Sequence, residues 1–286
     1  MTTHVIHQIV IVATGLGATL ASGQLMPPEM TPDETAGRLR VVHVGLVAPD
    51  IVGLTLRVGR IEHGRQAPYT PGPTDTVDRQ GHQRWVQRDG QLYGSLVGRD
   101  EALIWQVDRY VGDRLDPAWA DASASYRVVI GNGVPIEPRV LGRKTKPIDL
   151  GRVGPQHAWQ FDSPTESVVY LKLPEAVAPG VSLTLEAVDA RFPAQAIAID
   201  PLRLRSEAIH VSHTGFHPQD PAKVAFLSCW LGSGGPLSYT AGLPFRVVQV
   251  DTGRTCFEGK TTLSKAKEDK TEDAYKGNYS GVDVYQ

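Results

Sequence analysis

The sequence predicts an all-β protein, and three observations support this prediction. Short segments in which apolar and polar residues alternate recur along the chain, which is the pattern of strands with one buried face. The 286 residues include 29 glycines and 21 prolines, enough to end such strands in frequent turns. No long segment keeps a 3.6-residue apolar period between helix caps. Together these patterns favour short strands joined by turns over helices.

Composition and charge exclude several classes of protein. A hydrophobic fraction of 41% and a charged fraction of 21% are those of a folded globular chain rather than a disordered one. The formal net charge of −2 leaves no broad basic surface for a phosphate backbone, so nucleic acid is not an expected partner. The length suits two domains of ordinary size.

The start of the chain has the composition of a leader segment. Residues 9–21 are apolar, but they are too few to span a bilayer, which needs about 20 apolar residues. Their number fits the hydrophobic region of a signal peptide, and Ala21-Ser22-Gly23 offers small residues for cleavage. No Lys or Arg precedes them, and the alternative is a buried N-terminal strand. We expect residues 1–23 to be the signal peptide of a secreted or periplasmic protein without a membrane span, and the Pro-rich residues 24–35 to be a linker.

Residues 36–205 are expected to form a β-sandwich domain. Residues 84–97 contain Asp89-Gly90, a dipeptide typical of tight hairpin turns, so they are predicted to form two paired strands. Residues 169–173 and 183–187 each alternate apolar with polar side chains. This alternation predicts a second antiparallel pair, with one face on the core and the other in water.

Two charged segments of this domain are expected to be loops. Residues 137–154 carry a basic set, namely Arg139, Arg143, Lys144, Lys146 and Arg152. An acidic set precedes it, namely Glu101, Asp108, Asp113, Asp116 and Asp121. General acid–base catalysis would need two carboxylates held across a cleft, and calcium would need a turn that gathers several oxygens. A solvated loop remains the default for both segments, and no catalytic or metal-binding residue is assigned.

Residues 206–286 are expected to form a second β-domain. Its opening stretch, residues 209–228, begins as a short strand, breaks at Gly215 and a Pro-containing loop, and resumes as a second apolar strand. Further strands are predicted at residues 224–231, 245–250, 254–259 and 282–285. The Gly-rich sequence at 232–235 is not a phosphate loop, because no Lys-Ser/Thr follows it and no helix is predicted after it.

The second domain resembles a known family. The N-terminal immunoglobulin-like domain of family 9 glycoside hydrolases, the cellulase group, opens with Ile-x-Val, a Gly, a Pro and Lys-x-Ala. Matching residues here are Ile209, Val211, Gly215, Pro218, Lys223 and Ala225. Phe216 stands where the family has Tyr, and Ser212-His213 replaces the usual Asn-Gln pair. The resemblance covers residues 207–286, and it implies an Ig-like sandwich that is incomplete at its C-terminus.

This resemblance implies a function for the whole chain. In the family, a catalytic (α/α) barrel follows the domain and holds an Asp base and a Glu acid for inverting hydrolysis. No matching acidic motif occurs here, so we expect the non-catalytic N-terminal region of a secreted cellulase-like glycoside hydrolase that acts in polysaccharide breakdown. The expected partner is the barrel, in the same polypeptide and braced by this region; no cofactor is expected. The alternative is a carbohydrate-binding or cell-surface adhesion module with no enzymatic partner.

A few residues are candidates for binding or cross-linking. Trp119 and Trp159 lie in polar, loop-like surroundings, where an aromatic face could stack on a sugar, although packing is the commoner role. Trp105 and Trp230 lie in apolar strands and are expected in the core. Two cysteines, Cys229 and Cys256, could form a disulfide in an oxidising compartment or remain two buried thiols. His210, His213 and His217 are expected to be polar loop and edge residues rather than metal ligands.

Overall fold

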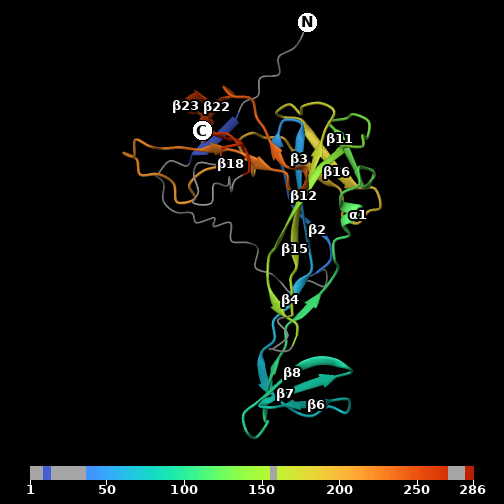
Figure 1. The fold of residues 1–286 in the computed structure, drawn as a ribbon. Coiled ribbons are helices and arrows are strands. Elements are labelled where there is room, and N and C mark those ends of the chain that lie inside the picture. Colours follow the sequence, from blue (N-terminus) through green and yellow to red (C-terminus); the bar gives the residue numbers. More distant parts are fainter. Residues whose placement is uncertain (1–8, 14–36, 155–159, 270–280) are drawn as a thin grey trace.

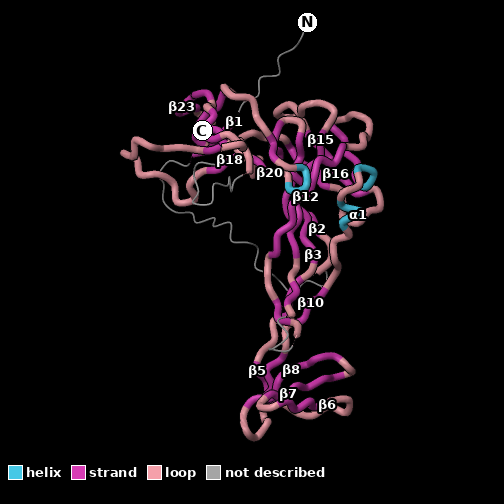
Figure 2. Tube along the Cα trace, viewed as in Figure 1, coloured by secondary structure: helices cyan, strands magenta, loops and turns pink. Residues whose placement is uncertain are grey.

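Strands are the main secondary structure of the described residues, and helices are few, as predicted. A computed structural model describes residues 9–13, 37–154, 160–269 and 281–286. Within these ranges the helical elements are α1 (Pro117–Ala120) and two 3₁₀ turns. Figure 1 shows an elongated molecule, with a sandwich and a C-terminal module side by side at one end and a separate sheet at the other. Figure 2 shows that loops join these strands throughout.

The sandwich is built from two antiparallel sheets. The first has the order β12 (Arg139–Pro147), β15 (Thr165–Lys172), β3 (Ile51–Val58), β2 (Arg40–Ala48). The second has the order β11 (Tyr126–Ile130), β16 (Ser182–Ala187), β17 (Gln195–Ala198). Alternate residues of the facing strands meet in one buried core, with Leu54 and Leu171 on one side and Val128, Leu183 and Leu185 on the other. The period of two therefore places the apolar side chains as the strand geometry requires.

The predicted pairing of residues 169–173 with 183–187 is wrong. These residues are strands, but β15 pairs with β3 and β12, whereas β16 pairs with β11 and β17 in the opposite sheet. The physical reason is that β15 is buried on both faces, since Val169 lies in the sandwich core and Tyr170 in a second cluster behind it. A strand of this kind lies inside a sheet covered on both sides.

The expected basic loop at 137–154 is also wrong, because its first half is the strand β12. The basic side chains of β12 are accommodated by carboxylates from other segments. Pairs form from Arg143 to Asp121 at 2.8 Å, from Lys144 to Glu207 at 2.9 Å, and from Lys146 to Glu166 at 2.8 Å. Burial alone would raise the pKa of Glu166, but its hydrogen bonds from Lys146 and Arg57 outweigh burial and lower it. Charge along this sequence therefore marks the exposed edge of a sheet.

A five-stranded sheet is inserted into the sandwich sequence and projects from it. Its order is β5 (Gln66–Pro68), β9 (Leu103–Gln106), β8 (Gln91–Val97), β7 (Gln83–Arg88), β6 (Thr76–Gln80). We call residues 63–108 the arm; it leaves and re-enters the body through β4 (Arg60–Glu62) and β10 (Arg109–Val111), which pair with each other. Asp89 and Gly90 both have positive φ between β7 and β8, so the predicted hairpin is confirmed.

The C-terminal module consists of small sheets. One has the order β18 (Ile209–His210), β19 (Phe226–Leu227), β25 (Val284–Tyr285), β24 (Leu263–Lys265). A second pairs β20 (Cys229–Trp230) with β21 (Pro236–Leu237), and a third pairs β22 (Pro244–Gln249) with β23 (Thr255–Lys260). The strand β1 (Ile9–Ala13) lies parallel to β22. The N-terminal run thus contains a strand, and its role as a signal peptide stays a prediction.

The sandwich and the C-terminal module share a buried interface, which we call the joint. It lies on the face of the four-stranded sheet opposite the sandwich core. The sheet contributes Val47, Ile51, Val168 and Tyr170, and the module contributes Ala208, Leu227, Cys229, Leu231 and Tyr285. Tyr239 of the module donates a 2.8 Å hydrogen bond to the carbonyl oxygen of Val47. Apolar burial and hydrogen bonding together fix the module on the sheet.

Glycines let two backbones meet at the edge of the joint. A Cβ atom at Gly142 of β12 would overlap the backbone nitrogen of Gly234, and one at Gly234 would lie 2.5 Å from the carbonyl oxygen of Leu141. The hydroxyl oxygen of Ser233 in the same loop accepts a 3.1 Å hydrogen bond from the backbone N–H of Arg143. The Gly-rich sequence at 232–235 is therefore a docking loop, in which a side chain at Gly232 or Gly234 would push the loop away from β12.

We predict that Gly142→Ala destabilises the joint. The added methyl has no room and should lower the free energy of unfolding by about 1–3 kcal/mol, as overpacking does. Gly53→Ala is the matched control, because its Cβ would also face the joint but meets Val168 at an ordinary 3.6 Å. Thermal unfolding of both variants measures the difference. Equal melting temperatures would show that the close approach at Gly142 carries no stability.

Candidate functional site

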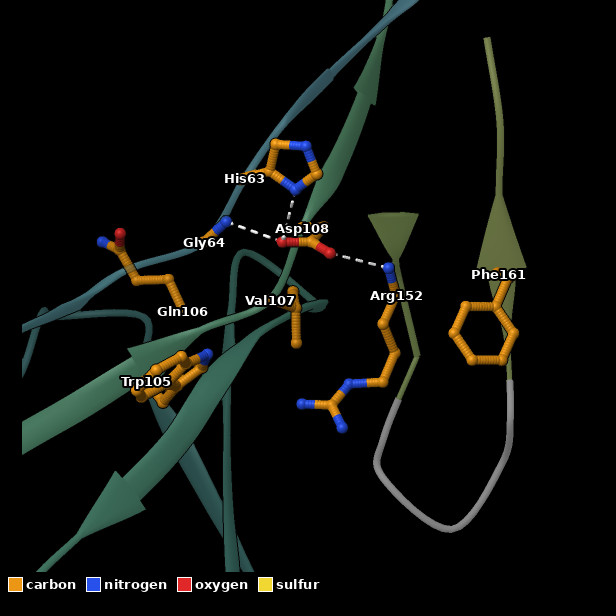
Figure 3. Close-up of a pocket in the computed structure, with 8 residues that line it drawn as sticks. All are labelled: His63, Gly64, Trp105, Gln106, Val107, Asp108, Arg152 and Phe161. Carbon is orange, nitrogen blue, oxygen red and sulfur yellow. Dashed lines mark hydrogen bonds and ion pairs between the residues drawn. The ribbon is translucent and has the colours of Figure 1, made fainter. Parts of the chain in front are cut away.

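A pocket lies at the neck, which we define as β4, β10 and the adjoining residues through which the arm joins the sandwich (Figure 3). Its volume is about 460 Å³, which is within the usual range for small-molecule sites. It is lined from four places in the sequence: the segment after β4, the end of β9 with the residues that follow it, and the short strands β13 (Gly151–Arg152) and β14 (Phe161–Asp162). The lining residues are His63, Gly64, Trp105, Gln106, Val107, Asp108, Arg152 and Phe161.

Asp108 ties these segments together. Its carboxylate accepts 2.7 Å hydrogen bonds from the backbone N–H groups of both Gly64 and Arg152. Its own backbone N–H donates to the carbonyl oxygen of Arg152 at 3.2 Å. Hydrogen bonds to an ionised acceptor are among the stronger ones in proteins. Because both carboxylate oxygens are already used, Asp108 suits a structural role better than proton transfer.

His63 is held between two carboxylates. Its Nδ1 lies 3.6 Å from Asp108 Oδ1, and its Nε2 lies 3.0 Å from Asp149 Oδ2. The main chain of Asp149 is itself fixed, since Ser163 donates a hydrogen bond to its carbonyl oxygen. This arrangement orients the imidazole at the rim of the pocket and connects the arm to the segment that precedes β13.

Two aromatic side chains flank the pocket. Trp105 is 50% exposed and Phe161 is 46% exposed. The expectation that Trp105 is a core residue is wrong, because its neighbour Ile104 takes the buried position in the arm's own small core with Val86 and Leu96. Successive residues of a strand point to opposite faces, so Trp105 faces outward.

The tryptophans predicted from sequence take other places. Trp119 is buried and packs against Tyr126 and Phe192, with ring centroids 5.4 and 6.4 Å away, so its ring is part of the sandwich core and is not available to a sugar. Trp159 lies outside the described residues. Trp230, expected in the core, is 44% exposed.

The acidic residues around the arm mostly have structural partners. Glu101 pairs with Arg79 and Arg84, Asp121 pairs with Arg143, and Asp116 caps α1 by accepting from the backbone N–H of Ala118 at 3.0 Å. Sequence reasoning singled out Asp108 with this set but could not show its role. That role depends on Gly64 and Arg152, each 44 residues away along the chain.

The exposure of Trp105 could have been predicted from the sequence, because its neighbour Ile104 takes the buried position of the strand.

The two cysteines are not joined in this structure. Cys229 is buried in the joint, and Cys256 is exposed on β23. Burial raises the pKa of the Cys229 thiol to about 12. Among the described residues, no three His, Cys, Asp or Glu side chains gather into a group that could hold a metal ion. His210 instead lies 3.1 Å from the carbonyl oxygen of Ser228, and His217 accepts from the backbone N–H of Gln219.

Comparison with known proteins identifies the C-terminal module. Residues 205–284 match the family model of the cellulase N-terminal ig-like domain, which confirms the resemblance found over residues 207–286. The match covers less than a third of the chain. No curated protein matches the chain, and no solved structure does. Within the described ranges, none of the helices has the length and apolar character needed to cross a membrane. The matched segment is thus a cellulase-associated N-terminal module.

We predict that Asp108→Ala loosens the attachment of the arm. Two backbone N–H groups would lose a charged acceptor, which should cost about 2 kcal/mol. Amide hydrogen exchange should accelerate at Gly64 and Arg152. Glu175→Ala, which removes an exposed carboxylate from a turn, is the control and should leave both rates unchanged. Unchanged exchange in Asp108→Ala would mean that other contacts hold the neck.

We also predict that the two thiols differ in reactivity. At pH 8 iodoacetamide should alkylate Cys256 in the folded protein and leave Cys229 unmodified, because Cys229 is buried and remains a thiol well above this pH. Unfolding in guanidinium should expose both, and mass spectrometry of peptides measures the extent. If neither thiol of the unfolded, unreduced protein reacts, the cysteines are joined and the prediction is wrong.

Proposed function

We propose that this chain is the non-catalytic N-terminal region of a secreted cellulase-like glycoside hydrolase, and that it braces a catalytic (α/α) barrel in the same polypeptide. The observation that supports this most directly is the match of residues 205–284 to the cellulase N-terminal ig-like domain. The barrel would supply the acid and the base for hydrolysis of a polysaccharide. The proposed domains are residues 36–205, which include the arm, and residues 206–286.

An exposed apolar surface on the module supports a bracing role. Phe257 of β23 is 59% exposed, and its ring lies 5.8 Å from that of Phe245 on β22. Phe257 is opposite Val247 in the strand register, and Phe245 is opposite Gly259, so these residues share one face of the hairpin. An exposed aromatic side chain beside a second ring is typical of a surface that packs on another domain.

The joint fixes the sandwich relative to the module, which a bracing role requires. Because the module is docked on the four-stranded sheet through apolar contacts and the glycine loop, the sandwich would keep a fixed orientation relative to a barrel bound to the module. Tyr170 contributes at the centre of this joint, because its hydroxyl donates to Glu207 and lies 3.2 Å from the carbonyl oxygen of Trp230. Burial, followed by the bond to Glu207, raises the pKa of Tyr170, so its hydroxyl stays a donor at physiological pH.

Two experiments test the proposed function. Sequencing the gene past Gln286 should reveal codons for a further strand and then a long helical region with paired acidic motifs. The full polypeptide should hydrolyse a soluble β-glucan such as carboxymethylcellulose, and the purified 286-residue chain should not. A stop codon directly after Gln286 would exclude the bracing role and favour the alternative, a binding or adhesion module with no enzymatic partner. Turnover by the 286-residue chain alone would contradict a non-catalytic role.

We predict that Phe257→Ser weakens the contact between the module and the barrel. Loss of one exposed aromatic contact from the interface should lower the melting temperature of the full polypeptide by about 2–4 °C, which corresponds to about 1 kcal/mol in a chain of this size. Val134→Ser is the control, because Val134 is 79% exposed on a turn of the sandwich. Equal melting temperatures for the two variants would place the interface elsewhere.

A further inference from the structure

We propose that the pocket at the neck binds a neutral pyranose unit of a polysaccharide chain. This inference rests on the proposed function for its ligand class, a β-glucan. Its structural basis is independent of that function, and lies in the exposed Trp105, the guanidinium of Arg152 and the charge balance of the pocket.

Trp105 provides a stacking surface. It comes from β9 of the arm and lines the pocket (Figure 3). Its side chain remains half exposed although it lies on a strand. A pyranose has an apolar face made of C–H groups, and the face of an aromatic ring packs well against such a surface.

Polar side chains beside Trp105 can bind hydroxyl groups. The Arg152 side chain extends into the space between Trp105 and Phe161 (Figure 3), and within the described ranges no hydrogen bond or ion pair is found for its guanidinium. Gln106 donates its amide N–H to Tyr93 Oη at 2.9 Å, which leaves the amide oxygen to accept a hydrogen bond. The pocket therefore offers several donors and one acceptor, a combination that suits the hydroxyl groups of a sugar.

The charges favour a neutral ligand over an acidic one. Arg152 points into the pocket, but Asp108 also lines it, and Asp149 Oδ2 lies 3.0 Å from Nε2 of the lining residue His63. Two carboxylates near one guanidinium leave no net positive field to attract a uronate or a sulfated sugar. A neutral sugar can form the hydrogen bonds without repulsion from these carboxylates.

The pocket is held in shape before a ligand arrives. Asp108 joins the Gly64 and Arg152 main chains, and the backbone N–H of Arg152 is therefore fixed while its side chain stays available. A preorganised site loses less conformational entropy on binding. The Arg152 side chain can consequently be changed without breaking the backbone bond that shapes the neck.

Isothermal titration of the full 286-residue chain with cellohexaose tests the inference. We expect saturable binding, with Trp105→Ala and Arg152→Gln each weakening Kd about tenfold. Trp230→Ala is the matched control, because Trp230 is an exposed tryptophan of the C-terminal module and should leave Kd unchanged. An oligogalacturonate probe of equal length should bind more weakly than cellohexaose. Circular dichroism melting confirms that each variant is folded.

The outcomes separate this inference from the proposed function. Absence of cellohexaose binding, equal affinity of Trp105→Ala and the unchanged chain, or tighter binding of the oligogalacturonate would each overturn the pocket assignment. Hydrolysis by the full polypeptide would stand in all three cases. Conversely, Trp105-dependent binding by a chain whose gene ends at Gln286 would support sugar binding in the pocket and contradict the proposal that the chain braces a barrel.

Discussion

The rest of the structure depends on one sheet that is buried on both faces. β3 and β15 place Leu54 and Leu171 in the sandwich core and turn Tyr170 toward the C-terminal module. An antiparallel sheet with one polar face can leave that face in water. This sheet has apolar side chains on both faces, so without the C-terminal module its outer apolar face would be exposed to water. The module that matches the cellulase family is thus a third layer of the fold, and the sandwich before it cannot be considered apart from it.

The neck attaches the small sheet of the arm to the sandwich while holding it away from the sandwich body. The arm has its own small core around Val86 and Ile104, and it is attached through a short strand pair and the carboxylate of Asp108. A charged acceptor shared by two main chains gives a rigid attachment without a large apolar interface. Space is left beside it, and that space is the pocket.

Sequence patterns predicted the strands better than their partners. The hairpin at Asp89-Gly90 follows from local turn chemistry, whereas alternation in residues 169–173 and 183–187 could not show that these strands belong to opposite sheets. The charges of β12 masked a strand because their partners come from distant segments. The pocket could not be predicted at all, since it is assembled from residues as far apart as His63 and Phe161.

The glycine loop of the joint has a consequence for how such modules recombine. Gly142 and Gly234 belong to different parts of the chain, yet each is required because the other main chain lies against it. Exchange of the C-terminal module with that of a relative would preserve the fold only if glycines were present on both sides of the joint. This requirement is one of steric complementarity between two backbones, which hydropathy does not reveal. It would cause the sandwich and its module to be inherited together.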